Sequence, residues 1–402
     1  MTTRVPLPTQ ATPTATGSAG TCAVEPFTVA VSQADLDDLR DRLARTRWAD
    51  ELPGAGWDYG TPVSYLRELC AYWADGFDWP AAQTRLNSWP QAVATVDGLR
   101  VHFLHVRSPE PDALPMILTH GWPGSVAEFL DVIGPLTDPR AHGGDPADAF
   151  HLVVPSLPGF GFSGPTTRRG VHGRVIADAF GRIMATLGYD RYVAQGGDIG
   201  ALISALLAER DPAAVPAFHL NLLPVGPADP TNPFAGLDGE DLALAQRTFG
   251  FLAHDAGYWR IQETRPQTVT TGLLDSPAAQ AAWIVEKFRA WTDCDGDVES
   301  AFTRDQLLTN ISVYWFTATA NSSARFYYEN NGPGRAQELP RTDVPCGYAE
   351  FPGEHFRMPR AYAEGRLNVV SWQPMARGGH FAALQVPDLY VDEIRRFFRD
   401  YR

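Results

Sequence analysis

The sequence has few cysteines, no long apolar run and no excess of basic residues. Its four cysteines, Cys22, Cys70, Cys294 and Cys346, lie far apart among 402 residues and form no CxxC pair. This spacing suggests neither a zinc site nor a dense disulfide framework, and it is typical of a protein from the reducing cytoplasm. Because no stretch approaches ~20 uninterrupted apolar residues, we expect no membrane span and a soluble product.

The charge balance excludes a further group of partners. The chain has 33 Lys and Arg residues against 47 Asp and Glu residues, which leaves a formal net charge of -14. A surface of this sign repels nucleic acids and anionic lipids over a Debye length, so we expect neither as a partner. The 44% hydrophobic content is enough to fill a sizeable core.

Strand and helix patterns divide the chain into five segments. Residues 1–24 are rich in Thr, Pro and Ala and predict a disordered tail. Residues 25–91, with one amphipathic helix and a tryptophan-rich stretch, predict a meander of short helices. Strands alternate with helices over 92–225, which is typical of an α/β core. The mostly helical residues 226–340 predict a lid, and the core resumes over 341–402.

The segment RYVAQGGDIGALISALLAE joins a strand to a helix through a turn rich in glycine. Gly196, Gly197 and Gly200 surround Asp198, which is the pattern of a nucleophile elbow with aspartate at its apex. Such a turn crowds backbone against strand and helix and exposes the apical side chain above the sheet. The alternative is an aspartate that only caps the helix. A cap, however, needs no third glycine and no partner histidine near the end of the chain.

A base and an acid follow the elbow in the order that α/β-hydrolases use, which is nucleophile, acid, histidine. His380 lies in the loop MARGGHFAALQ after the strand LNVVSW, and Glu354 lies in AEFPGEHFRMP after the strand VPCGYAEF. We therefore predict His380 as the base and Glu354 as its orienting acid, with Glu350 and Asp343 as alternatives for the acid.

The loop in PMILTHGWPGS follows a core strand and can point a backbone N–H at the nucleophile. We predict the amides of Trp122 and Ile199 as the oxyanion-hole donors. His120 could be mistaken for a base, but a histidine in such a turn more often braces the loop by hydrogen bonding.

A carboxylate nucleophile prefers displacement at saturated carbon and forms an alkyl ester, which water then hydrolyses. An epoxide also needs an acid for its oxygen, and a phenol with a pKa near ~10 can donate to it at neutral pH. The lid offers Tyr258, Tyr314, Tyr327 and Tyr328. These residues alone do not decide which two would act, because packing is the ordinary role of a tyrosine in a helical lid.

Several motifs together resemble the microsomal-type epoxide hydrolases, a family that includes the juvenile-hormone hydrolases and soluble bacterial relatives. They are LDDLRDRLARTRW, HGWPGS, LPGFGFS, GGDIGA, DAGYWRIQETRPQT, DSPAAQAAWIVEKF, LLTNISVYW, SSARFYYEN and RGGHFAAL. The resemblance implies an α/β-hydrolase fold with a mostly parallel central sheet, a helical lid insertion and an N-terminal meander that wraps the core and clamps the lid. It also implies a cis bond before Pro123. The membrane-anchoring helix of the animal enzymes is missing here, so we expect no membrane association.

Carried over position by position, the resemblance makes Asp198 the nucleophile, His380 the base, Glu354 its acid, and Tyr258 and Tyr327 the donors to the epoxide oxygen. It implies a small-molecule epoxide and water as reactants, with no cofactor and no metal. The oligomeric state stays open, a homodimer included. Some bacterial members open epoxides on enediyne or other polyketide precursors, so secondary metabolism and xenobiotic detoxification both stay open as roles.

Aromatic residues are candidates for the substrate pocket, although such residues are more often plain core. They are Trp122, Phe160, Trp259, Trp283 and Phe316. Two other functions deserve comparison. A haloalkane dehalogenase would use the same aspartate and histidine but would need N–H donors for halide instead of lid phenols. A ligand-binding protein of this fold usually lacks a catalytic group, and none is missing here. A serine esterase is disfavoured because the elbow contains no GxSxG.

Overall fold

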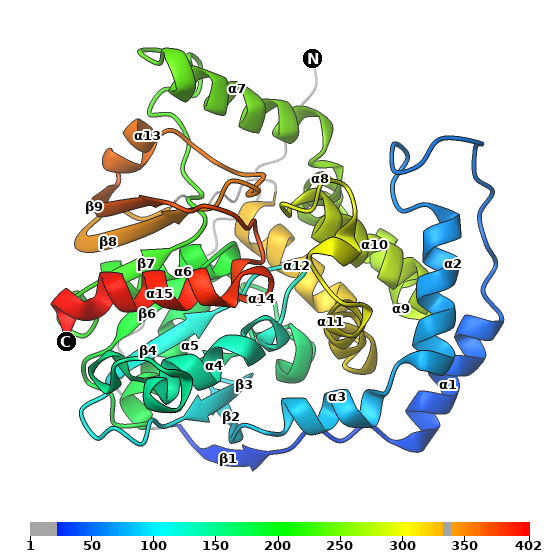
Figure 1. Cartoon of the computed structure of the whole chain (residues 1–402), viewed down its shortest axis with the longest axis horizontal. Helices are drawn as coiled ribbons and strands as arrows, with labels where there is room; N and C mark the ends of the chain where they lie inside the picture. The colour runs from blue at the N-terminus through cyan, green and yellow to red at the C-terminus, as the bar shows by residue number, and fades with distance from the viewer. Residues whose placement is uncertain (1–21, 333–338) are drawn as a thin grey trace, which may run out of the picture.

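A nine-stranded sheet in the order β1-β2-β3-β5-β4-β6-β7-β8-β9 forms the centre of the molecule (Figure 1). The computed structural model describes residues 22–332 and 339–402. The strands are β1 Val24–Phe27, β2 Gln91–Val96, β3 Leu99–Val106, β4 Leu114–Thr119, β5 Phe150–Pro155, β6 Val193–Gly196, β7 Phe218–Leu220, β8 Thr342–Glu350 and β9 Leu367–Pro374. Most of the predicted tail lies outside the described residues, and its last residue, Val24, begins β1.

The pairing of the strands changes from antiparallel to parallel across the sheet. The pairs β1/β2, β2/β3 and β3/β5 are antiparallel, whereas β4 and all strands beyond it pair in parallel. Strand β5 is buried along its whole length, as expected for a strand that helices cover on both faces. The sheet is therefore mostly parallel, as the sequence predicted.

Helices cover both faces of the sheet and enclose two apolar cores. One core joins the sheet to α5 (Gly173–Thr186) and α6 (Ile199–Arg210). The other joins it to α4 (Leu130–Thr137) and α15 (Pro387–Phe398). Two short helices of the second half of the core are α13 Arg360–Glu364 and α14 Ala382–Gln385. This layered arrangement is the α/β-hydrolase fold.

The segment FHLNLLPV at 218–225 has the pattern of a strand, but the strand that it forms is short. Strand β7 ends at Leu220, and the chain then leaves the sheet toward the lid. Pro224 cannot donate a backbone hydrogen bond, so it could not have continued the ladder in any case. The shortening places Asn221 and Leu222 at the carboxyl edge of the sheet, next to the elbow.

Among the described residues, six α-helices lie between β7 and β8, in the segment predicted as the lid (Figure 1). They are α7 Gly239–His254, α8 Gly257–Thr264, α9 Pro266–Asp275, α10 Pro277–Ala290, α11 Arg304–Phe316 and α12 Ala320–Asn331. Helix α12 packs on both α8 and α9, so the helices that carry Tyr258 and Tyr327 are neighbours. Residues 333–338 of the predicted lid lie outside the described part of the chain.

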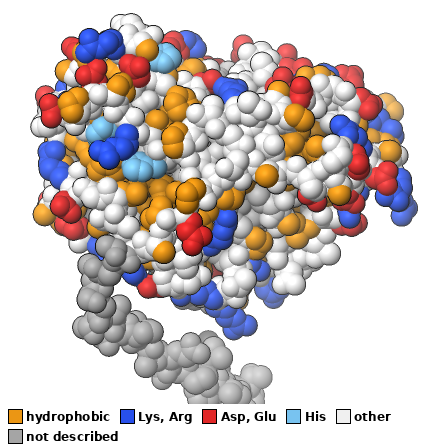
Figure 2. Space-filling model, turned by 90° about the horizontal axis from the view of Figure 1, so that it is seen from below, with side chains coloured by type: hydrophobic (Ala, Val, Ile, Leu, Met, Phe, Trp, Pro, Cys, Tyr) orange, Lys and Arg blue, Asp and Glu red, His pale blue; other side chains and the backbone are white. Residues whose placement is uncertain are grey.

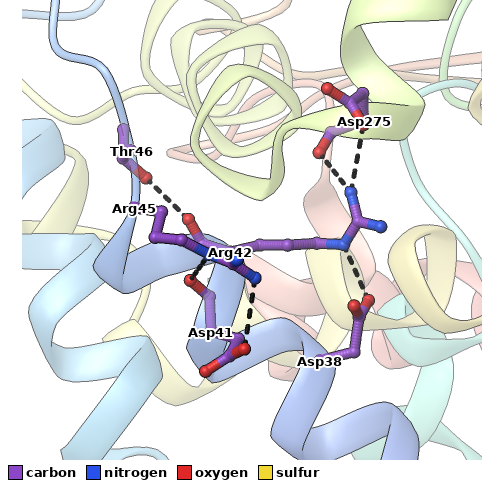
Figure 3. Close-up of polar contacts among 6 residues, drawn as sticks. All are labelled: Asp38, Asp41, Arg42, Arg45, Thr46 and Asp275. Atoms are coloured by element: carbon purple, nitrogen blue, oxygen red, sulfur yellow. Dashed lines mark hydrogen bonds and ion pairs between the residues drawn. The ribbon is translucent and has the colours of Figure 1, made fainter.

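The N-terminal segment runs along the lid and the core. It contains α1 (Gln33–Ala44), α2 (Val63–Ala71) and α3 (Trp79–Leu86). The Ser32 side chain caps α1 in a capping box. Figure 3 shows how Arg42 of α1 reaches Asp38 at 2.7 Å and the lid residue Asp275 at 3.1 Å. These exposed ion pairs contribute little stability, but they show that α1 lies against the end of α9.

The surface carries both signs of charge. Figure 2 shows acidic and basic side chains interspersed among neutral and apolar ones on one face. Within the described residues, no helix combines the length and apolar character needed to cross a membrane.

Candidate active site

The elbow holds Asp198 in a backbone conformation that non-glycine residues rarely adopt. Asp198 has φ 50° and ψ −125° between β6 and α6, a strained geometry that clusters at functional sites. The glycines around it allow close backbone approach. A Cβ on Gly196 would lie 2.3 Å from the Gly200 carbonyl carbon, and one on Gly200 would lie 2.0 Å from the Thr119 oxygen. No larger residue fits at either position without shifting the strand or the helix.

One oxygen of Asp198 is held by two backbone amides. The N–H groups of Trp122 and Ile199 donate to Asp198 Oδ1 over 2.9 and 2.7 Å, and these are the two donors that the sequence predicted. The Trp122–Pro123 bond is cis, which confirms that expectation. Gly121 leaves room for this contact, because a Cβ there would lie 2.3 Å from Asp198 Oδ1. The arrangement can stabilise negative charge on Oδ1.

His120 braces the same loop. Its Nδ1 lies 2.9 Å from the Gly121 oxygen, and its Nε2 accepts from the Leu157 amide over 3.2 Å. Burial lowers the pKa of His120 to about 4, so the ring is neutral in both contacts. Both ring nitrogens are therefore engaged, and His120 has no free nitrogen with which to act as a base.

His380 lies between Glu354 and Asp198. Its Nδ1 is 2.8 Å from Glu354 Oε2, and its Nε2 is 3.6 Å from Asp198 Oδ2. The alternatives for the acid lie elsewhere. Glu350 accepts from Arg357 at 2.8 Å and from the Trp372 indole at 3.1 Å. Asp343 is exposed in β8. Among the predicted acids, only Glu354 contacts the histidine.

The buried charges around His380 stabilise its imidazolium form. Burial favours the neutral ring, but Glu354, followed by Asp198 and Glu128, outweighs burial and raises the pKa of His380 to about 9. Burial would also raise the pKa of Glu354, yet the charges of His380 and His355 lower it well below its usual range. In the resting protein at neutral pH, His380 therefore carries a proton and Glu354 is ionised.

Tyr258 and Tyr327 stand over the elbow, on α8 and α12. The Tyr258 ring stacks on Trp122 at 5.2 Å, and the Tyr327 ring meets Trp122 edge-on at 5.9 Å. Neither hydroxyl hydrogen-bonds to another residue that the structure describes. Burial, followed by the charge of Asp198, raises the pKa of both phenols well above its usual value. Both therefore keep their protons at neutral pH.

The other two candidate tyrosines are placed differently. The Tyr314 hydroxyl donates to the Gly124 oxygen over 2.7 Å, so it braces the loop after Pro123. Tyr328 does not border the cavity beside Asp198. The pair that the resemblance implied is thus the pair that faces the elbow.

A cavity of about 160 Å³ lies between Asp198 and the lid. We call it the lid cavity. It is lined by Asp198, Ile199, Leu202, Leu222, Pro224, Tyr258, Trp259, Phe326, Tyr327, Asn330, Asn331, Leu339, His355 and Phe356. Most of these side chains are apolar, and the two phenols and the carboxylate are among the few polar groups. This is the usual composition of a site for a small apolar ligand.

Four of the five aromatic residues predicted for the pocket do not line the lid cavity. Trp122 borders a second, smaller cavity that Asp198 also lines. Phe160 is fully buried and contacts the rings of His120 and Phe326. Trp283 packs beside Lys287, and Phe316 packs on Trp79 at 4.8 Å. These three pack among other side chains of the core, and of the five predicted residues Trp259 alone lines the lid cavity.

His355 is a site residue that the sequence analysis missed. Its Nδ1 lies 2.8 Å from Glu354 Oε1, its ring stacks on Trp291 at 4.3 Å, and it borders the lid cavity. The sequence offered one indication of its role, because His355 directly follows Glu354 in the chain. Ligand atoms of Glu354, His355 and His380 lie within 4.8 Å of one another. A metal ion there would have to displace the hydrogen bond between Glu354 and His380.

The sequence matches two known families. Residues 24–129 match the family described as "Epoxide hydrolase N terminus", and residues 115–255 match "alpha/beta hydrolase fold". A candidate epoxide hydrolase of Stigmatella aurantiaca is 47% identical over 94% of this chain and 86% of its own length. Epoxide hydrolase 1 of Sus scrofa is 37% identical over 93% of this chain and 88% of its own.

Solved structures of epoxide hydrolases have the same fold over almost the whole chain. The epoxide hydrolase of Aspergillus niger gives a TM-score of 0.82 at 31% identity, covering 95% of this chain and 97% of its own. The juvenile hormone epoxide hydrolase of the silkworm Bombyx mori gives 0.81 at 30% identity, covering 95% and 94%. The chain therefore belongs to the microsomal-type epoxide hydrolases, enzymes of the α/β-hydrolase fold that act on small-molecule epoxides.

Proposed function

We propose that this enzyme converts an epoxide to a vicinal diol through a covalent alkyl ester on Asp198, which water activated by His380 and Glu354 then hydrolyses. The observation that carries the proposal is the position of the Asp198 carboxylate. Its Oδ1 is held by two amides, while the residue borders a cavity that also contains two phenols. A carboxylate beside two proton donors suits attack on an epoxide, whereas a halide would need N–H donors.

In the first step, Asp198 Oδ2 attacks one epoxide carbon. The bond between that carbon and the epoxide oxygen breaks, and a phenol of Tyr258 or Tyr327 donates its proton to the oxygen. The charge of Asp198 is among the causes that raise the pKa of both phenols. Ester formation removes that charge, so the phenol becomes a better acid while it donates.

Ester formation also changes His380. The charge of Asp198 helps to hold the pKa of His380 at about 9. When Asp198 becomes a neutral ester, that support disappears and the imidazole can release its proton, while the phenolate regains one. His380 is then a neutral base, and Glu354 keeps its ring oriented through Nδ1. The resting enzyme thus acquires its base after the ester has formed.

In the second step, water attacks the Asp198 carbonyl carbon and gives a proton to His380 Nε2. The amides of Trp122 and Ile199 stabilise the negative charge that develops on Oδ1. The bond between the carbonyl carbon and Oδ2 then breaks, and the imidazolium protonates the departing diol oxygen. The new carboxyl group returns its proton to His380, which restores the starting state.

The lid cavity indicates the class of substrate. Its mainly apolar lining and its volume of about 160 Å³ suit a small aryl or alkyl epoxide. Such a compound can come from secondary metabolism or from the environment, and the chemistry at Asp198 is the same in either role.

The proposal can be tested by trapping the ester with styrene oxide. We expect the His380→Gln variant to accumulate a covalent adduct, which mass spectrometry of its peptides places on Asp198. The Asp198→Ala variant should form neither adduct nor diol. Asp190→Ala, which removes an exposed aspartate just before β6, is the matched control and should keep full activity. An His380→Gln protein that never carries an adduct would rule out the covalent mechanism.

A further inference from the structure

A second cavity, of about 20 Å³, also borders Asp198. We call it the core cavity. Among the residues that line it are Asp198, His380, Thr119, Glu128 and Asn221. His380 borders the core cavity but is absent from the lining of the lid cavity. The candidate base therefore borders a different cavity from the candidate substrate pocket, and Asp198 borders both.

The size of the core cavity restricts what can occupy it. A cavity needs roughly 10–15 Å³ to hold one water molecule, and the core cavity has about 20 Å³. It can therefore take a water molecule, but it is too small for an epoxide with a carbon skeleton. The lid cavity, at about 160 Å³, is the larger of the two by far.

Polar groups in the wall of the core cavity match a bound water molecule. Thr119 is fully buried, and its hydroxyl has no hydrogen-bond partner within the part of the chain that the structure describes. Such a buried hydroxyl is costly unless a water molecule or a ligand satisfies it. Asn221, which is 5% exposed, accepts from Gln195 over 2.9 Å and packs its amide nitrogen against Gly197.

Glu128 is the buried acid in this wall that the two chemical steps leave unused. It lies in the short helix η2 (Val126–Phe129) and is 8% exposed. Its carboxyl group packs over Gly124, where an added Cβ would lie 1.3 Å from Glu128 Oε1. The glycine that follows Pro123 thus makes room for an acid beside the elbow.

The protonation state of Glu128 suits hydrogen bonding to water. Burial is the main cause that raises the pKa of Glu128 to about 8. The negative charge of Asp198 also raises this pKa, whereas the positive charge of His380 lowers it. At neutral pH the group is therefore mainly a carboxylic acid in the resting enzyme, with one O–H to donate and an oxygen to accept. When Glu128 ionises at higher pH, its charge adds to burial in raising the pKa of the phenols of Tyr314 and Tyr390.

We propose that the core cavity holds the water molecule that hydrolyses the ester, and that Glu128 and Thr119 position it between His380 Nε2 and the Asp198 carbonyl carbon. This inference rests on the proposed covalent mechanism. The substrate then enters from the lid cavity and the hydrolytic water from the core cavity. The alkyl group on Asp198 does not need to move aside for the water to attack.

The test separates ester formation from ester hydrolysis by rapid-quench kinetics with styrene oxide. In Glu128→Gln, we expect the rate of ester formation to stay within about threefold of the parent enzyme, because Glu128 does not border the lid cavity. Hydrolysis should slow by about 10- to 100-fold, the range for losing a well-placed buried hydrogen bond. The ester should accumulate on Asp198, and kcat and KM should fall together. Thr119→Val should slow hydrolysis in the same direction by a smaller factor.

Glu393→Gln is the matched control. Glu393 is a buried acid on α15, it bonds Arg396, and it lines neither cavity. Its substitution should leave the ratio of the two rates unchanged. If Glu128→Gln fails to fold, Thr119→Val decides the question alone.

Two failures can be told apart. If His380→Gln accumulates the ester while Glu128→Gln and Thr119→Val hydrolyse it at the parent rate, the water site is wrong and the covalent mechanism stands. If His380→Gln forms no ester, the covalent mechanism itself is wrong.

Discussion

The two cavities that meet at Asp198 have opposite chemical character. The lid cavity is mostly apolar and receives the phenols of Tyr258 and Tyr327, whereas the core cavity receives an imidazole, a carboxyl group and a buried hydroxyl. Asp198 borders both. In the proposed mechanism, one carboxylate therefore serves two half-reactions, with the proton donors for ring opening in one cavity and the base for hydrolysis in the other.

The sharpest way to disable the lid side is to remove both phenols. In the double variant Tyr258→Phe/Tyr327→Phe, no proton donor remains for the epoxide oxygen, so ester formation should fall by up to about 10⁴-fold, the upper range for general acid catalysis. Each single variant should lose less. Rapid-quench measurement of the adduct on Asp198 gives the rate directly.

Tyr189→Phe is the control for this experiment, because Tyr189 bonds His105 and borders neither cavity. Ester formation at the parent rate in the double variant would show that the phenols do not donate to the epoxide oxygen.

On the core side, we expect Glu354→Gln to leave ester formation nearly intact and to slow hydrolysis by roughly 10³-fold, within the range for general base catalysis. The oxygen of a neutral amide accepts a weaker hydrogen bond from His380 Nδ1 than a carboxylate does. It therefore holds the ring less firmly in the tautomer that leaves Nε2 free to act as the base. Accumulation of the ester by mass spectrometry would be the readout. If Glu354→Gln slowed ester formation and ester hydrolysis equally, Glu354 would support the structure of the whole site and not only the orientation of His380.

The pH dependence should separate the resting enzyme from the ester. In the resting enzyme, Glu354, Asp198 and Glu128 outweigh burial and raise the pKa of His380 to about 9. The neutral imidazole is the active base, so the hydrolysis rate should rise with pH and level off above the pKa of His380 in the ester. Because the ester has lost the charge of Asp198, that midpoint should lie below 9. A midpoint at or above this value in single-turnover kinetics would contradict the proposed role of the Asp198 charge.

The smallest effect is expected from the apolar wall of the lid cavity. Leu222 is buried and lines that cavity alone. Leu222→Ala should lower kcat/KM for styrene oxide by about tenfold, since lost apolar contacts in a pocket cost about 1–3 kcal/mol. The rate of ester hydrolysis should not change. If Leu222→Ala slowed only the hydrolysis of the ester, Leu222 would act in the second step, and the assignment of the two cavities to the two steps would be wrong.

The parts of the site that the sequence could predict are those written in continuous segments. The glycines around Asp198 and the loop around His380 have a local pattern, so the elbow, the amide of Trp122 and the alternation of core strands with helices could be predicted. Tyr258 and Tyr327 lie on separate lid helices, and only the family resemblance selected them. Their position over the elbow depends on how α8 and α12 pack.

Other parts depended on contacts that no local pattern encodes. Glu128 has the sequence character of an acid in the first turn of a helix, and its burial beside the elbow follows from the space above Gly124. His355 stands beside Glu354 but faces the lid cavity because its ring stacks on Trp291. Phe160 packs in the core and does not line the lid cavity, and the sequence could not show this because an aromatic residue in a core and one in a pocket have the same sequence pattern.

The most direct test of the account follows the oxygen of water through one turnover. Enzyme in excess over styrene oxide is allowed to react once in water labelled with heavy oxygen. Because water attacks the carbonyl carbon of the ester, the account predicts that the label enters the Asp198 carboxylate and that the diol carries none. Label in the diol after this single turnover, with none in the Asp198 peptide, would show that water attacks the epoxide directly and that no ester forms.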